Sequence, residues 1–508
     1  MILTRRTVCI LLTALILLGM LAGCGGNKET ASQSIPATGE VTTQPPELPP
    51  NDTDDLPEGL DFGGKTITLY AYVQSETVRE FLQETDVGSE VPYAVYARNR
   101  KVESRLNCNI TAYERVGDTN TTFVSDEITN MIASGLTTYQ IITTAGYRMC
   151  GMANNGMFLD LLKLEYINTG KDYYSEGYNK ALSIGDSQYL VTGKFSLSYY
   201  RYMIAMLFNK TLFNDGGVDY PYQTVLEGNW DFEEAARLSK LFYKDINGDG
   251  IFDVSDTYGY VMWVGSGSSL TDGYMASAGL RVIGKDGENY FKADISSAAN
   301  FSKGVDNILS MMYNEGSYTS PNYFDVIKKF SGGTAALTSF RMFHLEETAM
   351  GNFGATGLGY GILPLPKSDA DGQAEYYSYI QDQCLLFGLP KTLGSSPMLV
   401  QVSQFLEAYA SESYRTLKPA YYEKALTARY ATDTQSQKML AIMDSTTFVD
   451  PANVYIGAGF SKLNSPSLRD LYASGTNTVS SMLEKQSGLT EQIIQMNENY
   501  RKMAQPSA

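Results

Sequence analysis

Hydrophobic and polar residues alternate from Lys65 to Val73, and this period of two predicts a β-strand. The patterns that follow predict, in order, a helix at 92–106, a strand at 108–114, a helix at 121–134 and a strand at 140–144. Strands and helices that alternate at this spacing predict a parallel sheet with crossover helices. Ligands of such sheets bind beyond the carboxyl ends of the strands, where Tyr72 and Tyr147 lie.

The same kinds of pattern continue through the rest of the chain without an internal repeat. Strands are expected at 188–192, 202–208, 258–264, 335–339, 359–363 and 384–389, and helices at 231–243, 297–313, 397–411, 412–430 and 434–444. A chain of 508 residues exceeds the usual size of one compact domain. We therefore expect two α/β lobes.

The first 60 residues have a different character. Arg5 and Arg6 precede an apolar run from Val8 to Leu21 that is short for a membrane span. This order predicts a secretory signal at residues 1–23, with a single transmembrane anchor as the alternative. A cysteine directly after Leu-Ala-Gly resembles a bacterial lipobox, which implies a lipidated Cys24 and an anchor on the extracytoplasmic face of the bacterial cell membrane. The proline-rich, polar stretch 24–60 predicts a disordered tether.

Composition excludes several classes of protein. A formal charge of −17 argues against nucleic acid and anionic lipid surfaces as partners. His344 is the only histidine, which excludes a His-rich metal site and weakens a Ser-His-Asp or Cys-His catalytic site. Beyond Cys24, the mature chain has Cys108, Cys150 and Cys384; buried free thiols are favoured, and one Cys108–Cys150 bridge is the alternative.

A calcium-type loop lies at residues 245–256. Oxygen donors fall at loop positions one, three, five, seven, nine and twelve: Asp245, Asn247, Asp249, the backbone carbonyl of Ile251, Asp253 and Asp256. Gly250 holds position six, where such loops turn sharply. The alternative is an Asx-rich turn without an ion. We expect a structural Ca²⁺ here and no catalytic cofactor.

Several motifs occur in the order found in a known family. They are the lipobox, Asn209-Lys210 with Leu212-Phe213 and Gly216-Gly217, Trp230-Asp231 at a helix start, Asn247-Gly-Asp249-Gly with Tyr258-Gly259, Phe330-Ser-Gly-Gly333-Thr-Ala-Ala336, and Gly361-Ile-Leu-Pro364-Leu-Pro366. From Asp61 to Tyr430 the chain resembles the extracellular solute-binding lipoproteins of ABC transporters, of the maltose- and oligosaccharide-binding type. It departs from their pattern at Leu337, where methionine is usual.

This resemblance implies a two-lobed α/β fold of the periplasmic-binding-protein type (type II), with a ligand cleft between lobes joined by crossing strands. By analogy, residues 61–193 plus 331–364 form the first lobe and residues 194–330 plus 365–508 the second. The crossings are expected near Gly193–Ser198, Ser331 and Pro364–Pro366. The resemblance also implies a monomer that binds a small carbohydrate, carries out no chemistry and delivers its ligand to the transmembrane subunits of an ABC permease.

Aromatic and guanidinium side chains at strand ends and crossings are the candidate ligand contacts, because aromatic faces stack on sugars and guanidinium groups bind their oxygens. The candidates are Tyr72, Tyr147, Tyr199, Tyr200, Arg201, Trp263 and Arg341. Packing in the core or hinge is the alternative role for Trp263, Tyr199 and Tyr200. Other solutes (a peptide, or a ferric ion at Tyr199-Tyr200), a secreted glycoside hydrolase, and an adhesion or signalling lipoprotein are the alternative functions.

Overall fold

The computed structural model describes residues 50–73, 80–82, 90–116, 123–265, 268–295, 298–346, 359–368, 372–422, 433–455, 467–484 and 487–505. Its first sheet has the strand order β12-β3-β1-β2. The strands are β1 (Lys65–Val73), β2 (Cys108–Val116), β3 (Ile141–Ala145) and β12 (Leu385–Gly388). β1 is parallel to β2 and β3, which confirms the predicted parallel sheet, and β12 is antiparallel to β3.

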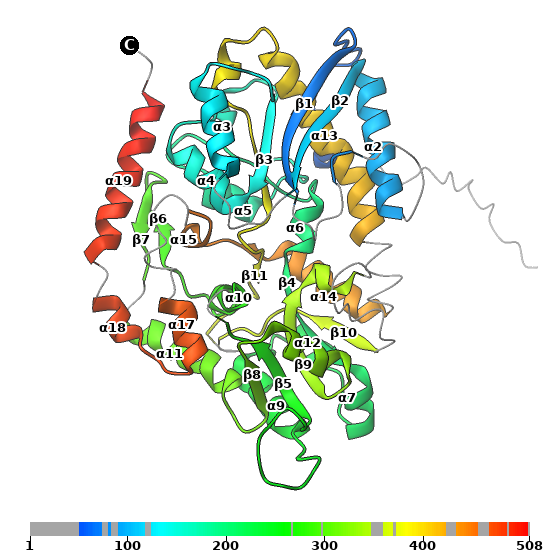
Figure 1. The fold of residues 1–508 in the computed structure, drawn as a ribbon, viewed down its shortest axis with the longest axis vertical. Helices are drawn as coiled ribbons and strands as arrows, with labels where there is room; N and C mark the ends of the chain where they lie inside the picture. The colour runs from blue at the N-terminus through cyan, green and yellow to red at the C-terminus, as the bar shows by residue number, and fades with distance from the viewer. Residues whose placement is uncertain are drawn as a thin grey trace, which may run out of the picture. The chain divides into compact units, whose positions relative to one another are not determined.

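Helices cover this sheet and complete the first lobe (Figure 1). They are α2 (Glu90–Leu106), α3 (Phe123–Ala133), α4 (Gly146–Asn154), α5 (Glu176–Leu182) and α13 (Leu399–Lys418). α13 comes from late in the chain but packs along α2, and Val102 and Phe405 are both fully buried in the core of this lobe. α13 runs continuously through the predicted boundary between helices 397–411 and 412–430, because no glycine or proline interrupts it before Pro419.

The second sheet has the strand order β10-β4-β9-β5-β8. Its strands are β4 (Ile204–Asn209), β5 (Tyr258–Trp263), β8 (Ser317–Ser320), β9 (Ala335–Arg341) and β10 (Tyr360–Leu363). β5 is parallel to β8 and β9, whereas β4 is antiparallel to β9 and β10. The carboxyl ends of the three parallel strands therefore share one edge.

The helices of the second lobe are α7 (Lys210–Gly216), α8 (Tyr222–Leu226), α9 (Phe232–Phe242), α10 (Leu270–Ser277), α11 (Ala298–Met312), α12 (Tyr323–Ser331) and α14 (Thr434–Ser445). α9 begins as its sequence indicates, because the Asp231 carboxylate accepts a hydrogen bond from the backbone N–H of Glu234 at 2.8 Å. Its apolar stripe, which includes Phe232 and Ala235, is buried.

The structure corrects the predicted lobe boundaries. Residues 331–364 were expected in the first lobe, but β9 and β10 pair with β4 in the second sheet, so the chain does not cross at Ser331. The elements on either side show that the chain changes lobe within 192–203, between β10 and β12 (364–384), and between α13, which packs on α2, and α14, which packs on β10. The predicted crossing at Gly193–Ser198 lies within the first of these segments, and Pro364–Pro366 begins the second. Because α13 packs on α2, the segment 365–508 is divided between the lobes instead of belonging to the second alone.

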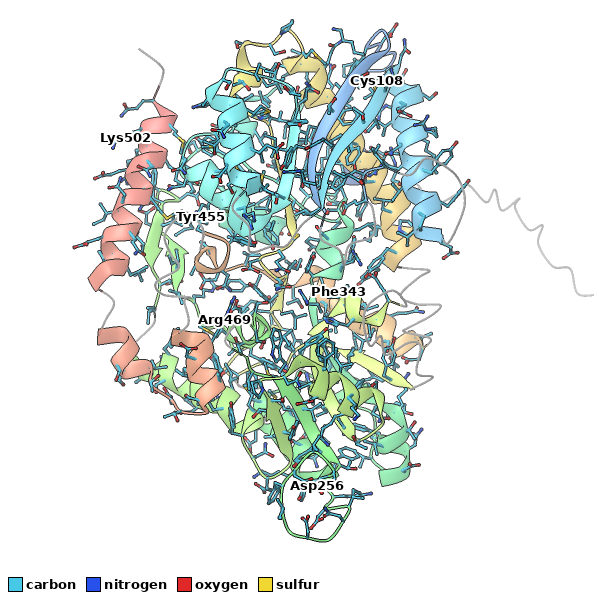
Figure 2. All side chains as sticks on the ribbon, viewed as in Figure 1. Cys108, Asp256, Phe343, Tyr455, Arg469 and Lys502 are labelled. Atoms are coloured by element: carbon cyan, nitrogen blue, oxygen red, sulfur yellow. The ribbon has the colours of Figure 1, made fainter. Side chains whose placement is uncertain are left out.

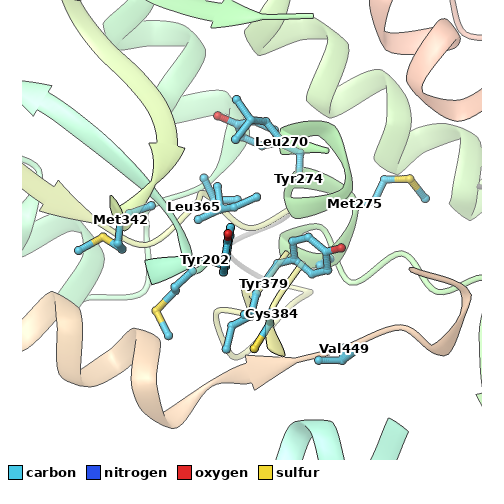
Figure 3. Close-up of a cluster of buried hydrophobic side chains, with 14 of the residues drawn as sticks. Tyr202, Leu270, Tyr274, Met275, Met342, Leu365, Tyr379, Cys384 and Val449 are labelled. Carbon is cyan, nitrogen blue, oxygen red and sulfur yellow. The ribbon is translucent and has the colours of Figure 1, made fainter. Parts of the chain in front are cut away.

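Apolar side chains from the crossing segments and from the turn after β9 pack together where the lobes join (Figure 3). Tyr202, Met342, Leu365, Tyr379 and Cys384 are buried in this cluster. Two short strands, β11 (Ser378–Tyr379) and β13 (Thr447–Phe448), pair in parallel in the same region. Close packing makes the region a defined junction, which we call the lobe junction.

The remaining elements connect or flank the lobes. Within the described residues they are α6 (Leu197–Arg201), β6 (Ile283–Lys285), β7 (Phe291–Ala293), α15 (Pro451–Val454), α17 (Ser467–Ser474), α18 (Val479–Glu484), α19 (Ser487–Ala504) and the 3₁₀ turns at Pro50–Asp52, Leu161–Lys163, Met342–Leu345 and Lys391–Ser395. The predicted strand at 188–192 is reduced to a single bridge between Val191 and Phe387.

The first lobe includes residues before the predicted boundary at Asp61. Asp54 pairs with Arg105 at 2.6 Å and Asp55 with Lys171 at 2.6 Å, so acidic residues assigned to the tether hold residues 50–60 on the first lobe. Positions 1–23 and Cys24 lie outside the described residues. Within the described part of the chain, no helix combines the length and hydropathy needed to cross a membrane.

Candidate functional site

The carboxyl ends of the parallel strands carry three of the predicted ligand residues. Trp263 ends β5, Arg341 ends β9, and Tyr147 follows β3 at the start of α4. Tyr72 is the next-to-last residue of β1, opposite Arg115 of β2. The topology therefore places all four at the sheet edges where such folds bind ligands.

Trp263 belongs to an aromatic corner formed with Tyr323 and His344. The indole is half-buried, donates its Nε1–H to the backbone carbonyl of Pro321 at 3.1 Å, and meets the Tyr323 ring edge to face with centroids 5.4 Å apart. Gly265 permits this position, because a Cβ there would lie 2.7 Å from the indole nitrogen. An indole fixed in this way offers a rigid apolar surface beside the strand end.

His344 supports the corner as a neutral side chain. Its Nδ1 lies 3.1 Å from the Arg341 carbonyl oxygen, and its Nε2 bonds to the Tyr323 hydroxyl. Burial lowers the pKa of His344 well below its usual value, and the nearby Arg341 charge lowers it further. The sequence marked His344 only as the lone histidine, and no pattern linked it to Tyr323.

Arg341 and Tyr147 come from different lobes but meet the same turn of the second crossing. Arg341 Nη1 donates to Gln381 Oε1 at 2.9 Å and to Gln383 Oε1 at 3.2 Å, and its guanidinium lies 4.3 Å from the centroid of the Phe343 ring. The backbone N–H of Tyr147 lies 3.3 Å from the Asp382 carbonyl oxygen. The turn 381–383 therefore contacts the guanidinium of Arg341 in the second lobe and the backbone of Tyr147 in the first.

Asp382 adds a buried carboxylate to this turn. Burial raises its pKa to about 6, the charge of Arg469 opposes this rise, and the charge of Asp272 adds to it. Arg469 also forms a two-point ion pair with Asp272, at 2.6 Å and 3.3 Å (Arg469 is labelled in Figure 2). Sequence reasoning missed this cluster, because α10, α17 and the crossing turn are far apart in the chain and carry no shared motif.

Tyr199, Tyr200 and Arg201 are buried in the lobe junction. The Tyr199 hydroxyl bonds to Thr447 at 2.7 Å, and the Tyr200 hydroxyl donates to the Lys194 carbonyl at 3.2 Å. Burial raises the pKa of both phenols above the usual value. The guanidinium of Arg201 is buried as well, in an ion pair. All three side chains thus have structural partners, and the structure does not bring them to the strand-end site.

The loop 245–256 connects α9 to β5, with Asp256 labelled in Figure 2. Asp245 accepts hydrogen bonds from the N–H groups of Gly248 at 2.7 Å and Gly250 at 2.9 Å, and both glycines have φ near +72°. These two bonds and glycine turns wrap the first half of the loop around the Asp245 carboxylate.

Asp256, at the twelfth position of the loop, forms hydrogen bonds that hold the loop together. The Asp256 carboxylate accepts from the N–H groups of Ile246 and Asp253 at 3.2 and 3.3 Å and from the Tyr243 hydroxyl at 3.2 Å. These donors occupy both of its oxygens. Among the residues with defined positions, no group of three or more His, Cys, Asp or Glu side chains is arranged to hold a metal ion. Calcium binding by the loop stays a prediction.

The three described cysteines are free and buried, which confirms the favoured interpretation over a Cys108–Cys150 bridge. Burial raises the pKa of each thiol, to about 12 for Cys108 and Cys384 and well above its usual value for Cys150. Buried, protonated thiols are unreactive.

Comparison with known proteins identifies a solved structure with a similar fold. No family model matches the chain, and no curated protein matches it. Among solved structures, it is similar to the ABC substrate-binding protein Lmo0181 from Listeria monocytogenes in complex with cycloalternan, with a TM-score of 0.50 and 12% identity over 86% of this chain and 99% of that one. At this identity the likeness concerns the fold alone. The chain therefore has the two-lobed, periplasmic-binding-protein-like α/β fold that is also found in an ABC substrate-binding protein.

Proposed function

We propose that this chain is a substrate-binding lipoprotein that captures an extracellular carbohydrate, an oligosaccharide above all, and delivers it to an ABC import permease. The strongest support is the fold, which is shared with a substrate-binding protein solved with the carbohydrate cycloalternan. Lipidation at Cys24 and a tether up to residue 49 are part of the proposal. They would hold the body beside the permease at the membrane surface.

The chemistry of the strand ends supports a sugar ligand. Trp263 and Tyr323 supply apolar ring surface, on which the C–H face of a sugar stacks. Arg341 with Gln381 and Gln383 supplies donors and acceptors for hydroxyl groups. Closure of the lobes around a ligand is a population shift that ligand binding drives through its higher affinity for the closed state.

The same residues weaken the alternatives. A glycoside hydrolase uses two carboxyl groups across the scissile bond. Asp382 has a raised pKa, but the neighbouring carboxylate, Asp272, is held in a two-point ion pair with Arg469. A ferric site on Tyr199 and Tyr200 would need phenolates, and burial raises the pKa of both groups. A peptide ligand stays an alternative for the experiment.

The test is thermal unfolding of the mature chain against a panel of mono- and oligosaccharides and short peptides. A ligand at about 100 times its dissociation constant should add about 2.7 kcal/mol to the free energy of unfolding. Trp263→Ala should abolish the ligand-induced shift. Tyr93→Ala, which removes an exposed aromatic side chain on α2, is the matched control and should keep it. Stabilisation by peptides alone, or by no compound, would contradict the carbohydrate proposal.

A further inference from the structure

The β6–β7 hairpin, residues 283–293, extends from the second lobe to the first. It lies between α10 and α11 in the chain, and both helices pack against the second sheet or its helices. The elements that precede and follow it in the chain therefore belong to the second lobe. Its turn, at residues 286–290, contacts the segment Ser183–Gly185, directly after α5 of the first lobe.

Four polar contacts make this connection. Lys285 Nζ donates to the Ser183 carbonyl at 2.5 Å. Asn289 Nδ2 donates to the Ser183 hydroxyl at 3.2 Å and to the Gly185 carbonyl at 2.9 Å, while the Gly185 N–H donates to the Asn289 carbonyl at 3.1 Å. Each lobe contributes both donors and acceptors.

The hairpin turn is preorganised for these contacts. The Asp286 carboxylate accepts from the N–H groups of Glu288 and Tyr290 at 2.9 and 2.8 Å, and Asn289 adopts φ +62°. On the first lobe, Gly185 has φ +57°, and a Cβ there would lie 2.9 Å from the Tyr290 hydroxyl. Glycine at this position thus lets the hairpin approach the first lobe closely.

The other side of the hairpin is also covered. Asn497 of α19 bonds to the backbone N–H and carbonyl of Phe291 at 3.1 and 2.9 Å (Figure 1 shows α19 beside β7). The same helix reaches the first lobe, where Tyr500 lies 5.6 Å from the Tyr189 ring. The hairpin is therefore held between α19 and the first lobe.

A cavity of about 1380 Å³ lies beside these contacts. The hairpin lines it with Lys285 and Asn289, the first lobe with Lys180, and the first crossing with Lys194 and Tyr199. The cavity thus separates part of the hairpin from the first crossing, and the contacts at Ser183–Gly185 bridge the lobes beside it. Close packing therefore does not fill the space beside these contacts.

We propose that the β6–β7 hairpin is a clasp that limits how far the two lobes open. The crossings define a hinge, and the clasp ties the lobes at a separate place through hydrogen bonds that can break and reform. Releasing it would widen the range of lobe positions in the unliganded protein. The proposal does not depend on the class of ligand.

The test measures the distance between the lobes by double electron–electron resonance. Spin labels are placed at Leu136→Cys on the first lobe and Leu226→Cys on the second, both exposed positions, in mature chain carrying Cys24→Ser. The three described native cysteines are buried and do not compete for label. Asn289→Ala and Lys285→Met each remove clasp contacts, so two independent variants address the same connection.

Each clasp variant loses the net stabilisation of one or two hydrogen bonds. The population of distances outside the wild-type range should therefore increase about fivefold. Asn477→Ala is the matched control, because Asn477 bonds to Ser302 and Asp306 within the second lobe only. A wild-type distribution in both clasp variants, or an equal change in Asn477→Ala, would overturn the proposal. No ligand is needed, so the result is independent of the carbohydrate test.

Discussion

Arg201 and Glu346 form a two-point ion pair inside the lobe junction, with Nε–Oε1 and Nη2–Oε2 distances of 2.7 Å each. Arg201 lies at the end of the first crossing, and Glu346 follows the strand that ends at Arg341. The side chains are 3% and 10% exposed, and Tyr421 donates a further hydrogen bond to Glu346 at 2.8 Å. The pair therefore ties two connecting segments through a shielded electrostatic contact.

Removing one partner of this pair should destabilise the protein strongly. Glu346→Ala leaves the Arg201 guanidinium buried without its counter-charge, and the expected loss is about 3–5 kcal/mol of unfolding free energy. Urea unfolding of the mature chain measures it. Glu234→Ala is the control, because Glu234 pairs with Arg237 at the surface, where such a pair contributes at most about 1 kcal/mol. Equal losses in the two variants would contradict the structural role of the buried pair.

The two tryptophans should respond differently to replacement by alanine. Trp230 is fully buried and donates to the Pro364 carbonyl at 3.0 Å, so Trp230→Ala should lower stability by about 3–5 kcal/mol. Trp263 is half-buried, and Trp263→Ala should lower it by about 1 kcal/mol while abolishing the ligand-induced shift. Thermal unfolding with and without ligand measures both effects. A ligand-induced shift of wild-type size in Trp263→Ala would show that the indole does not contact the ligand.

The sequence predicted the secondary structure better than it predicted how the chain returns between lobes. Strand 65–73 matches β1 at both ends, because its alternation is uninterrupted. The prediction that the chain crosses back to the first lobe at Ser331 was wrong. The pattern of 335–339 marks a buried strand but does not specify which sheet that strand joins. That choice depends on pairing with β4, more than 100 residues earlier in the chain.

Residues of the candidate site could be predicted from the sequence only where they lie at the end of a predicted strand. Trp263 and Arg341 are the last residues of their strands and Tyr147 follows one, so the structure places all three at the predicted edges. Gln381 and Gln383 lie in an irregular crossing turn, where no periodicity marks a side chain's partner. Their contacts with Arg341 depend on tertiary packing that local sequence does not encode.

Glu407 should make stability fall as pH rises. It is buried on α13 and accepts hydrogen bonds from the hydroxyls of Tyr173 and Tyr174. Burial raises its pKa from 4.5 to about 7, so between these values the native state binds a proton that the unfolded state has released. The stabilisation by protonated Glu407 is present below about pH 4.5 and is lost by about pH 7, amounting to about 3 kcal/mol at most.

Urea unfolding at pH 5 and pH 7.5 checks this linkage. Glu407→Gln keeps a carbonyl oxygen for the tyrosine hydroxyls and removes the titration, so the difference in stability between the two pH values should shrink relative to wild type. Glu233→Gln, at an exposed position in the first turn of α9, is the control and should leave the difference unchanged. A Glu407→Gln variant with the wild-type pH dependence would contradict the assignment.

Calcium binding to the loop 245–256 should stabilise the second lobe. The proposed ligands are Asp245, Asn247, Asp249, Asp253 and the Ile251 carbonyl; the sixth predicted ligand, Asp256, is left out because its carboxylate already accepts three hydrogen bonds. With a dissociation constant of about 10⁻⁴–10⁻³ M, about 10 mM calcium should raise the unfolding free energy by roughly 1.4–2.7 kcal/mol. Thermal unfolding with calcium, magnesium or a chelator measures the effect. No shift with calcium would show that the loop is an Asx-rich turn without an ion.

Two loop variants separate ion binding from loop closure. Asp249 is exposed, and its carboxylate bonds only within the loop, to Ile251 at 2.7 Å and to Asn247 at 2.7 Å. Asp249→Asn should therefore abolish the calcium shift with little loss of stability in chelator. Asp256→Asn should lower stability even in chelator, because its carboxylate accepts three hydrogen bonds that close the loop. Asp215→Asn, at an exposed position on α7, should keep both the calcium shift and the stability in chelator.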